Sequence, residues 1–235
     1  MAYREFRPPA PLRELVECGW TNEFPARPVA SSVDILPDGC MDLVWTGTEL
    51  LVAGPDTAPH PYRPPAGRDA AGLRFAPGRL PTLLGVSAAA LRDLRVPLLE
   101  LLPRSARSAT ARLERGAPPA GVLVELAGQL PGPAPDPGVA VVVGHARRGR
   151  SVDATADALG WTTRSLHRHC RDWFGYGPSV LRRVLRFRDA VALLRTGIAP
   201  ADVAARAGYA DQPHLSREMR ALAGRAPRQF TTGAS

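Results

Sequence analysis

One six-residue pattern occurs twice in this chain of 235 residues, and it restricts the fold more than any other feature. Residues 166–171 and 215–220 both read Leu, any residue, Arg, any residue, a soft apolar residue, Arg. Each copy follows a glycine, Gly160 or Gly208, that ends a short Ala-rich segment with helical spacing. A helix, a glycine turn and a second helix with outward-facing arginines form the outline of a helix-turn-helix. The repeat therefore predicts two such motifs in one domain.

An apolar stripe in each second helix decides which side of that helix faces the core. The stripe residues recur at intervals of three or four, as one buried helix face requires. They are Leu166, Cys170 and Trp173 in the first copy and Leu215, Met219 and Leu222 in the second. The outward side chains are then rich in arginine. The candidate DNA-contacting residues are Arg164, His167, Arg168, Arg171, Gln212, His214, Ser216, Arg217 and Arg220.

These residue types suit the reading of base edges in duplex DNA. Arginine offers a planar fork that can bond guanine O6 and N7 together, and glutamine can do the same for adenine N6 and N7. Arg182, Arg183 and Arg186 fall on the helix that joins the two motifs, where we expect them to meet phosphates or water. A single arginine-faced helix would be an ordinary solvated surface. Two copies behind matching turns favour DNA binding over that simpler interpretation.

The charge distribution points the same way. All 30 basic residues are arginine, and the formal net charge is +8. Residues 1–135 hold 14 arginines and 14 acidic residues, whereas residues 136–235 hold 16 arginines and 8 acidic residues. A GC-rich genome explains arginine in place of lysine, but not an imbalance confined to one half. A basic half beside a neutral half favours a module that faces a polyanion, joined to one that does not.

The first 80 residues read as short strands. Pro37-Asp38-Gly39 lies between two apolar-rich runs and is turn chemistry, so we expect a β-hairpin over Val33–Trp45. Further strands are expected at Leu50–Pro55 and Gly72–Phe75, with a loop over Pro59–Gly67. The Pro-rich start of the chain should be irregular, apart from one strand or helix around Leu12–Trp20.

Helical spacing begins at Leu80, and a break separates two groups of helices. Residues 131–138 alternate proline with other residues and cannot hold regular structure, so they form the clearest linker. We therefore expect an N-terminal sensing or dimerisation domain over 1–130, a linker over 131–138 and a DNA-binding domain over 139–235. The predicted fold class is α+β: a mixed, β-rich N-terminal domain with trailing helices, followed by an all-α double helix-turn-helix domain.

Several classes of protein are disfavoured. No apolar run of about 18 residues exists and the start of the chain lacks an apolar signal core, so we expect neither a membrane span nor secretion. Cys18, Cys40 and Cys170 are odd in number and widely spaced, which favours a reducing cytoplasm over a disulfide framework. His60 is the only histidine of the N-terminal half, so we expect no metal and no cofactor. No phosphate-loop or nucleophile-elbow motif is present, so we expect no enzyme activity.

A few residues of the N-terminal half allow sharper interpretations. Cys40 could make the chain a thiol-reactive or DNA-repair protein, although a buried structural thiol is the commoner case. Asp34, Asp38 and Asp42 are evenly spaced, but near a turn we expect solvated carboxylates. Trp20 and Trp45 could line an effector pocket, with core packing as the simpler alternative.

The C-terminal half resembles the DNA-binding domain of the AraC/XylS family of bacterial transcription regulators, over about residues 139–230. The residues that carry the resemblance are Ala156-x-x-x-Gly160-Trp161, Leu166-His167-Arg168, Gly175-x-x-Pro178, Phe187 to Leu194, Ala204-x-x-x-Gly208-Tyr209-x-Asp211-Gln212, His214 to Met219 and Gly224-x-x-Pro227-x-x-Phe230. This likeness implies seven helices, with two recognition helices held by one long helix and entering successive major-groove segments. It adds Pro213 to Arg164, His167, Arg168, Gln212 and Arg217 as a position matching a base-contacting site. His169 stands where the family usually has an apolar residue.

The N-terminal half resembles an uncharacterised domain that often precedes such DNA-binding domains in actinobacteria. The matching stretches are Ile35 to Leu43, Ala53-Gly54-Pro55, Leu73 to Gly78 and Leu83 to Val86. By analogy, this domain should sense a ligand, dimerise, or both. Together with the resemblance of the C-terminal half, it implies a cytoplasmic activator or repressor that binds double-stranded DNA, with a small-molecule effector and RNA polymerase as further partners, as a monomer or homodimer. The alternatives are the Cys40 chemistry above and an interaction module that has lost operator readout, which Pro213 and His169 make conceivable.

Overall fold

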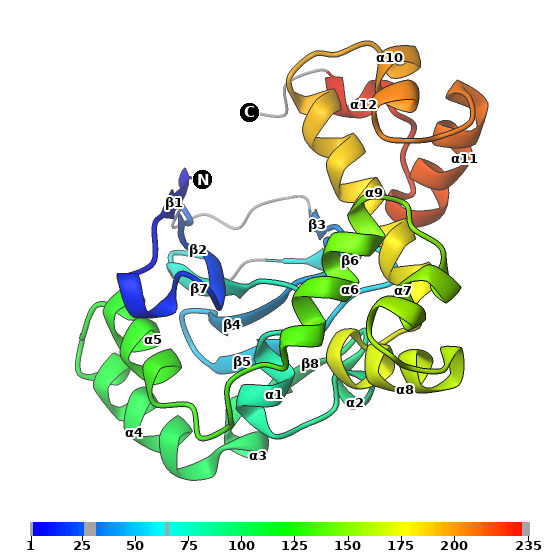
Figure 1. The fold of residues 1–235 in the computed structure, drawn as a ribbon. Coiled ribbons are helices and arrows are strands. Elements are labelled where there is room, and N and C mark those ends of the chain that lie inside the picture. Colours follow the sequence, from blue (N-terminus) through cyan, green and yellow to red (C-terminus); the bar gives the residue numbers. More distant parts are fainter. Residues whose placement is uncertain (1, 26–31, 64–65, 232–235) are drawn as a thin grey trace.

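The computed structural model describes residues 2–25, 32–63 and 66–231. A six-stranded antiparallel sheet forms the centre of the N-terminal half, in the order β1-β2-β7-β4-β5-β8. A second sheet pairs β3 with β6 and lies beside the long helix α9 (Figure 1). The strands are β1 (Ala2–Phe6), β2 (Val16–Glu23), β3 (Val33–Ile35), β4 (Met41–Trp45), β5 (Leu50–Ala53), β6 (His60–Tyr62), β7 (Ala70–Phe75) and β8 (Arg95–Pro97), with a 3-10 turn at Ala10–Leu12.

One face of the large sheet carries the core of the N-terminal half. Strand alternation places Leu43, Leu73 and Phe75 on this face, where none of them is exposed to solvent. Helices cover this face, and Leu123 of α5 is equally buried in the same cluster. These helices are α1 (Leu80–Leu84), α2 (Ala88–Leu91), α3 (Leu98–Leu101), α4 (Pro103–Glu114) and α5 (Pro119–Gly128).

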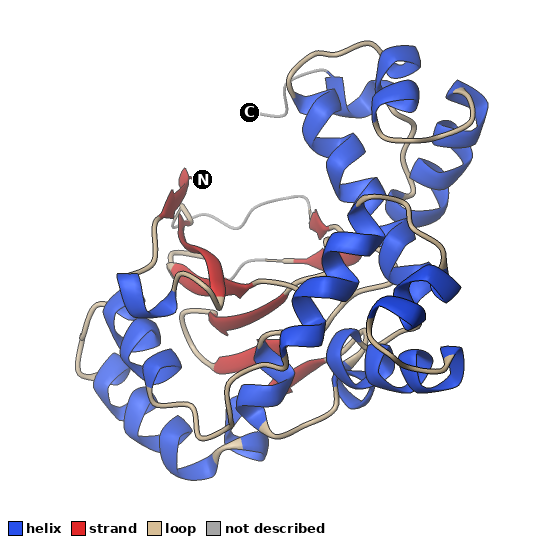
Figure 2. Cartoon of the chain, viewed as in Figure 1, coloured by secondary structure: helices blue, strands red, loops and turns tan. Residues whose placement is uncertain are grey.

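The described part of the C-terminal half contains helices and loops, whereas the strands all fall in the N-terminal half, as Figure 2 shows by colour. Seven helices follow one another over the described residues from 137 to 231, which confirms the number implied by the resemblance. They are α6 (Pro137–Arg147), α7 (Val152–Ala158), α8 (Thr163–Phe174), α9 (Pro178–Arg195), α10 (Pro200–Arg206), α11 (Gln212–Ala223) and α12 (Arg228–Thr231). In the described part of the chain, no helix combines the length and apolar character needed to cross a bilayer. The predicted α+β class is confirmed.

The predicted hairpin over Val33–Trp45 is wrong. The turn forms, with Gly39 at φ +82°, but β3 pairs with β6 while β4 pairs with β5 and β7. The Asp38 carboxylate accepts a hydrogen bond from the Cys40 amide (2.8 Å) and pairs with Arg74 of β7 at 3.3 Å. These contacts hold the turn against the large sheet, so the chain passes from one sheet to the other instead of folding back.

Other expectations for the N-terminal half need smaller corrections. The loop predicted over Pro59–Gly67 contains β6, and residues 64–65 lie outside the described part. The start of the chain is not irregular, because β1 pairs with β2 along its length. Residues 26–31 of that predicted irregular stretch are outside the described part. The strands expected at Leu50–Pro55 and Gly72–Phe75 are confirmed as β5 and β7.

Candidate nucleic-acid interface

The first helix-turn-helix consists of α7 and α8. The Ser151 hydroxyl caps α7 by accepting a hydrogen bond from the Ala154 amide (3.1 Å), and the Thr162 hydroxyl caps α8 through the Ser165 amide (3.1 Å). Gly160 lies between the helices at φ +66°, a conformation that glycine adopts without strain. Leu166 is fully buried, so the α8 stripe faces the core as predicted.

The second motif repeats this construction in α10 and α11. Its turn contains Gly208 at φ +74°. The Asp211 carboxylate caps α11 by accepting from the His214 amide (2.6 Å). Leu215 and Met219 are fully buried. Both motifs therefore hold their second helix with one apolar side inward and one side toward solvent.

The predicted contact residues lie on those outer sides. Two of them, His214 and Ser216, are half-buried, and the rest are exposed. The exposed ones are Arg164, His167, Arg168 and Arg171 on α8 and Gln212, Pro213, Arg217 and Arg220 on α11. The salt bridges found among the described residues include none of these arginines. Their guanidinium groups therefore remain available to a polyanion.

His214 has a structural role in the second turn. Its Nδ1 atom accepts a hydrogen bond from the Ala210 amide (3.4 Å), and its ring meets the Tyr209 ring edge-on with centroids 5.2 Å apart. Pro213 occupies the first turn of α11, where the missing N–H costs no helical hydrogen bond.

The long helix α9 joins the two motifs, and two of its arginines bind residues of the second motif. Arg183 Nε donates to Glu218 Oε2 at 2.6 Å, and the Arg186 guanidinium lies 4.2 Å from the centre of the Tyr209 ring. We expected Arg183 and Arg186 to meet phosphates or water, and the structure shows that both also brace α11 and its turn. Sequence spacing gave no sign of this, since Glu218 lies 35 residues from Arg183. Arg182 is exposed.

His169 completes an aromatic stack in the first motif. Its ring centroid lies 4.2 Å from that of Trp161 and 5.3 Å from that of Trp173. The side chain is half-buried. The polar residue thus packs where the resemblance implies an apolar one, and the motif keeps its shape.

The two second helices lie at opposite ends of α9, and both run along the right-hand side of Figure 1. With 18 residues, α9 spans about 27 Å at 1.5 Å per residue. The length of α9 is of the same order as one turn of B-form DNA, about 34 Å.

The thiols do not offer a reactive alternative. Cys40 is 4% exposed, and burial raises its pKa well above the usual range. Burial also raises the pKa of Cys18 to about 11 and that of Cys170 to about 12. With their pKa values raised, all three thiols are protonated near neutral pH, and the protonated form is a poor nucleophile. Among the described residues, no group of three or more His, Cys, Asp or Glu side chains could hold a metal ion.

Comparisons with known proteins agree with this geometry. A family model described as a helix-turn-helix domain matches residues 155–233, and one described as a domain of unknown function (DUF6597) matches residues 4–97. The search of curated proteins found no match.

Solved structures resemble the chain at low identity. An apo form of a ToxT variant from Vibrio cholerae strain SCE256 is 9% identical with a TM-score of 0.50, and the match covers 91% of this chain and 96% of that one. ToxT from Vibrio cholerae O395 gives a TM-score of 0.49 at 9% identity, covering 92% and 99%. The xylose-binding transcription activator XylR is 19% identical with a TM-score of 0.37, covering 41% of this chain and only 27% of its own length.

The matched helix-turn-helix region coincides with the two capped motifs and their outward arginines. The structural match to ToxT covers both halves of the chain, so the two proteins share their overall fold. Residues 155–233 are therefore a helix-turn-helix domain, and the chain that carries it is a DNA-binding transcription regulator.

Proposed function

We propose that α8 and α11 are both recognition helices and that they enter successive major-groove segments on one face of the duplex. The observation that carries this proposal is the shared construction of the two motifs: a capped second helix with its apolar stripe buried and its arginines unpaired and exposed. Arg164, His167 and Arg168 would read one segment, and Gln212 and Arg217 the other. Arg171, Pro213, His214, Ser216 and Arg220 border these positions and would contact flanking bases or phosphates.

The proposal extends to the domain boundaries, the location and the partners of the protein. The family matches on either side of residues 131–138 support domains at 1–130 and 139–235. The predicted linker was two residues too long at its end, because α6 begins at Pro137. The raised thiol pKa values support a protein without thiol-based catalysis. DNA as the target supports a cytoplasmic location. We further propose that the N-terminal domain responds to a small-molecule effector, and that the protein acts near RNA polymerase as a monomer or homodimer.

Selection of bound duplexes from a random pool tests the proposal. The purified chain should enrich a bipartite sequence, and Arg168→Ala and Arg217→Ala should each cost about 1–3 kcal/mol of specific binding, because each removes one base contact. Each variant should also relax preference in a different half of the site. Arg115→Ala is the matched control, since Arg115 is exposed at the end of α4, far along the chain from both motifs. Unchanged affinity and sequence preference in both test variants would refute this assignment of recognition helices.

A further inference from the structure

Residues 33–42 connect the two halves of the molecule, and we call them the coupling segment. They comprise β3, the turn at Pro37–Gly39 and the first two residues of β4. The three evenly spaced aspartates of this segment were expected to be solvated, but each forms an ion pair. Asp34 pairs with Arg225, while Asp38 and Asp42 both pair with Arg74.

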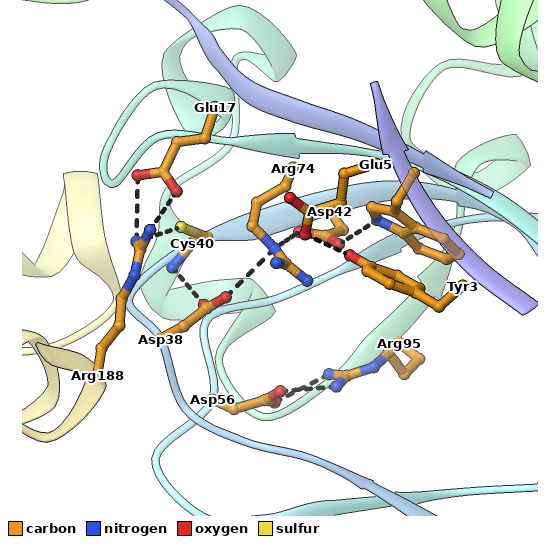
Figure 3. Close-up of polar contacts among 11 residues, drawn as sticks. Tyr3, Glu5, Glu17, Asp38, Cys40, Asp42, Asp56, Arg74, Arg95 and Arg188 are labelled. Carbon is orange, nitrogen blue, oxygen red and sulfur yellow. Dashed lines mark hydrogen bonds and ion pairs between the residues drawn. The ribbon is translucent and has the colours of Figure 1, made fainter. Parts of the chain in front are cut away.

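One end of the coupling segment is anchored on the large sheet. Arg74 of β7 lies 3.3 Å from the Asp38 carboxylate and 3.5 Å from that of Asp42. The indole N–H of Trp20, on β2 at the other side of β7, donates to the Asp42 carboxylate (2.9 Å). The stick view shows these side chains converging on one patch of the sheet (Figure 3). These contacts fix this end of the segment to the sheet.

The middle of the segment meets α9. Gly39 has φ +82°, and a Cβ built there would lie 3.2 Å from Leu185 Cδ2, so helix and turn are in close contact. Next to it, Arg188 of α9 donates to the Cys40 sulfur at 3.3 Å and to both carboxylate oxygens of Glu17, at 3.1 and 2.5 Å (Figure 3). Arg188 thus ties α9 to both the segment and β2.

The other end of the segment reaches the second helix-turn-helix. Arg225, which follows α11, donates to the Asp34 carboxylate. Leu36 packs against the apolar cluster that contains Leu215 and Met219 of α11. A residue of the N-terminal half is therefore part of the second motif's packing.

The first helix-turn-helix is held by different elements of the N-terminal half. The Ser87 hydroxyl donates to Asp172 at the end of α8 (2.9 Å), and Arg92 donates to the Gly175 carbonyl (3.4 Å). A Cβ at Gly175 would lie 2.7 Å from Pro55 Cγ. The N-terminal half thus contacts the two motifs through different elements. The relative position of the motifs therefore depends on these contacts as well as on α9.

We propose that the coupling segment fixes the second helix-turn-helix relative to the first, so that the spacing of half-sites accepted on DNA depends on the N-terminal domain. This inference rests on the proposed two-helix reading of DNA. The N-terminal domain could then control operator binding through the coupling segment. A shift of the Asp38–Arg74–Asp42 cluster would move the segment, and the segment would move α11 relative to α8.

Asp34→Asn isolates the contact. Loss of an acidic charge strengthens binding to a polyanion in general, so weaker specific binding by this variant would have a geometric cause. The matched control is Glu125→Gln, which makes the same charge change in an ion pair with Arg112 (2.7 Å) between α4 and α5. A charge swap, Asp34→Arg with Arg225→Asp, should restore the wild-type behaviour and shows that the fold survives.

Two readouts decide the inference. On a selected duplex, Asp34→Asn should bind at least about fivefold more weakly than Glu125→Gln, within the range of typical couplings between sites. Inserting one base pair between the half-sites should weaken binding by the wild type. The same insertion should weaken binding by Asp34→Asn less. In the free protein, amides of α11 and α12 should exchange with solvent faster in Asp34→Asn, while those of α8 stay unchanged.

If Asp34→Asn matches Glu125→Gln in both affinity and exchange, the coupling segment does not hold the second motif. If the wild type enriches no duplex, the proposed function fails. In that case the exchange of α11 and α12 still decides whether the segment holds the motif.

Discussion

At the scale of single residues, close contacts between the two halves of the chain depend on glycines. Gly175 has φ +82° and contacts Pro55 and the Ala88 carbonyl, where an added Cβ would lie 2.7 and 3.1 Å away. Gly197 has φ +83° but nothing within 4 Å of such a Cβ. Gly197→Ala should therefore cost only the conformational strain of about 1–2 kcal/mol. Gly175→Ala should cost at least about 1 kcal/mol more, because it also forces the halves apart. Urea unfolding of the two variants measures the difference, and equal losses would contradict the contact.

Asp42 gives a residue-scale test of the half-buried cluster formed by Asp38, Asp42 and Arg74. Its side chain is 15% exposed, and burial raises its pKa to about 6, against the opposing effect of Arg74. The folded state then binds the proton more tightly than the unfolded state. Asp42 therefore lowers stability as pH rises from about 4 to about 6, and its effect is constant above that. The free energy of unfolding of wild type minus that of Asp42→Asn should fall by about 1–3 kcal/mol between pH 4.5 and 7.5. A flat difference would mean that Asp42 titrates normally.

At the scale of elements, helices were predictable where their signals are local. The Leu-x-Arg repeat predicted α8 and α11, and Gly160 and Gly208 marked the two turns. The pairing of β3 with β6 was not predictable, because it depends on contacts between segments about 27 residues apart, and the turn signal at Gly39 fits a hairpin equally well. The bracing of α11 by Arg183 was missed for the same reason. Local patterns identified the helices and their outward sides, and long-range charge pairs decided how they are held.

The cap of α11 supplies the prediction at this scale. Asp211 is its N-cap, and Asp211→Ala should cost about 1 kcal/mol, because the His214 amide loses its acceptor. Asp189→Ala on α9 removes the same charge from an exposed position, and we expect a change within about 0.5 kcal/mol. Hydrogen exchange should locate the loss in α11. Faster exchange spread evenly over all helices would contradict a local capping role.

At the scale of the whole molecule, the charge asymmetry should appear in the salt dependence of DNA binding. Each phosphate neutralised by the protein releases condensed counterions, so log K falls with log salt by about 0.9 per contact. The excess of arginine lies entirely in residues 136–235. Arg182 is exposed on α9, in the basic half, while Arg115 is exposed in the neutral half. Arg182→Ala should reduce the slope by about 1 and weaken binding to all duplexes alike, whereas Arg115→Ala should leave the slope unchanged. Titrations of an unselected duplex at several salt concentrations measure both. Equal reductions in the two variants would mean that DNA contacts both halves, and unchanged slopes in both would remove Arg182 from the interface.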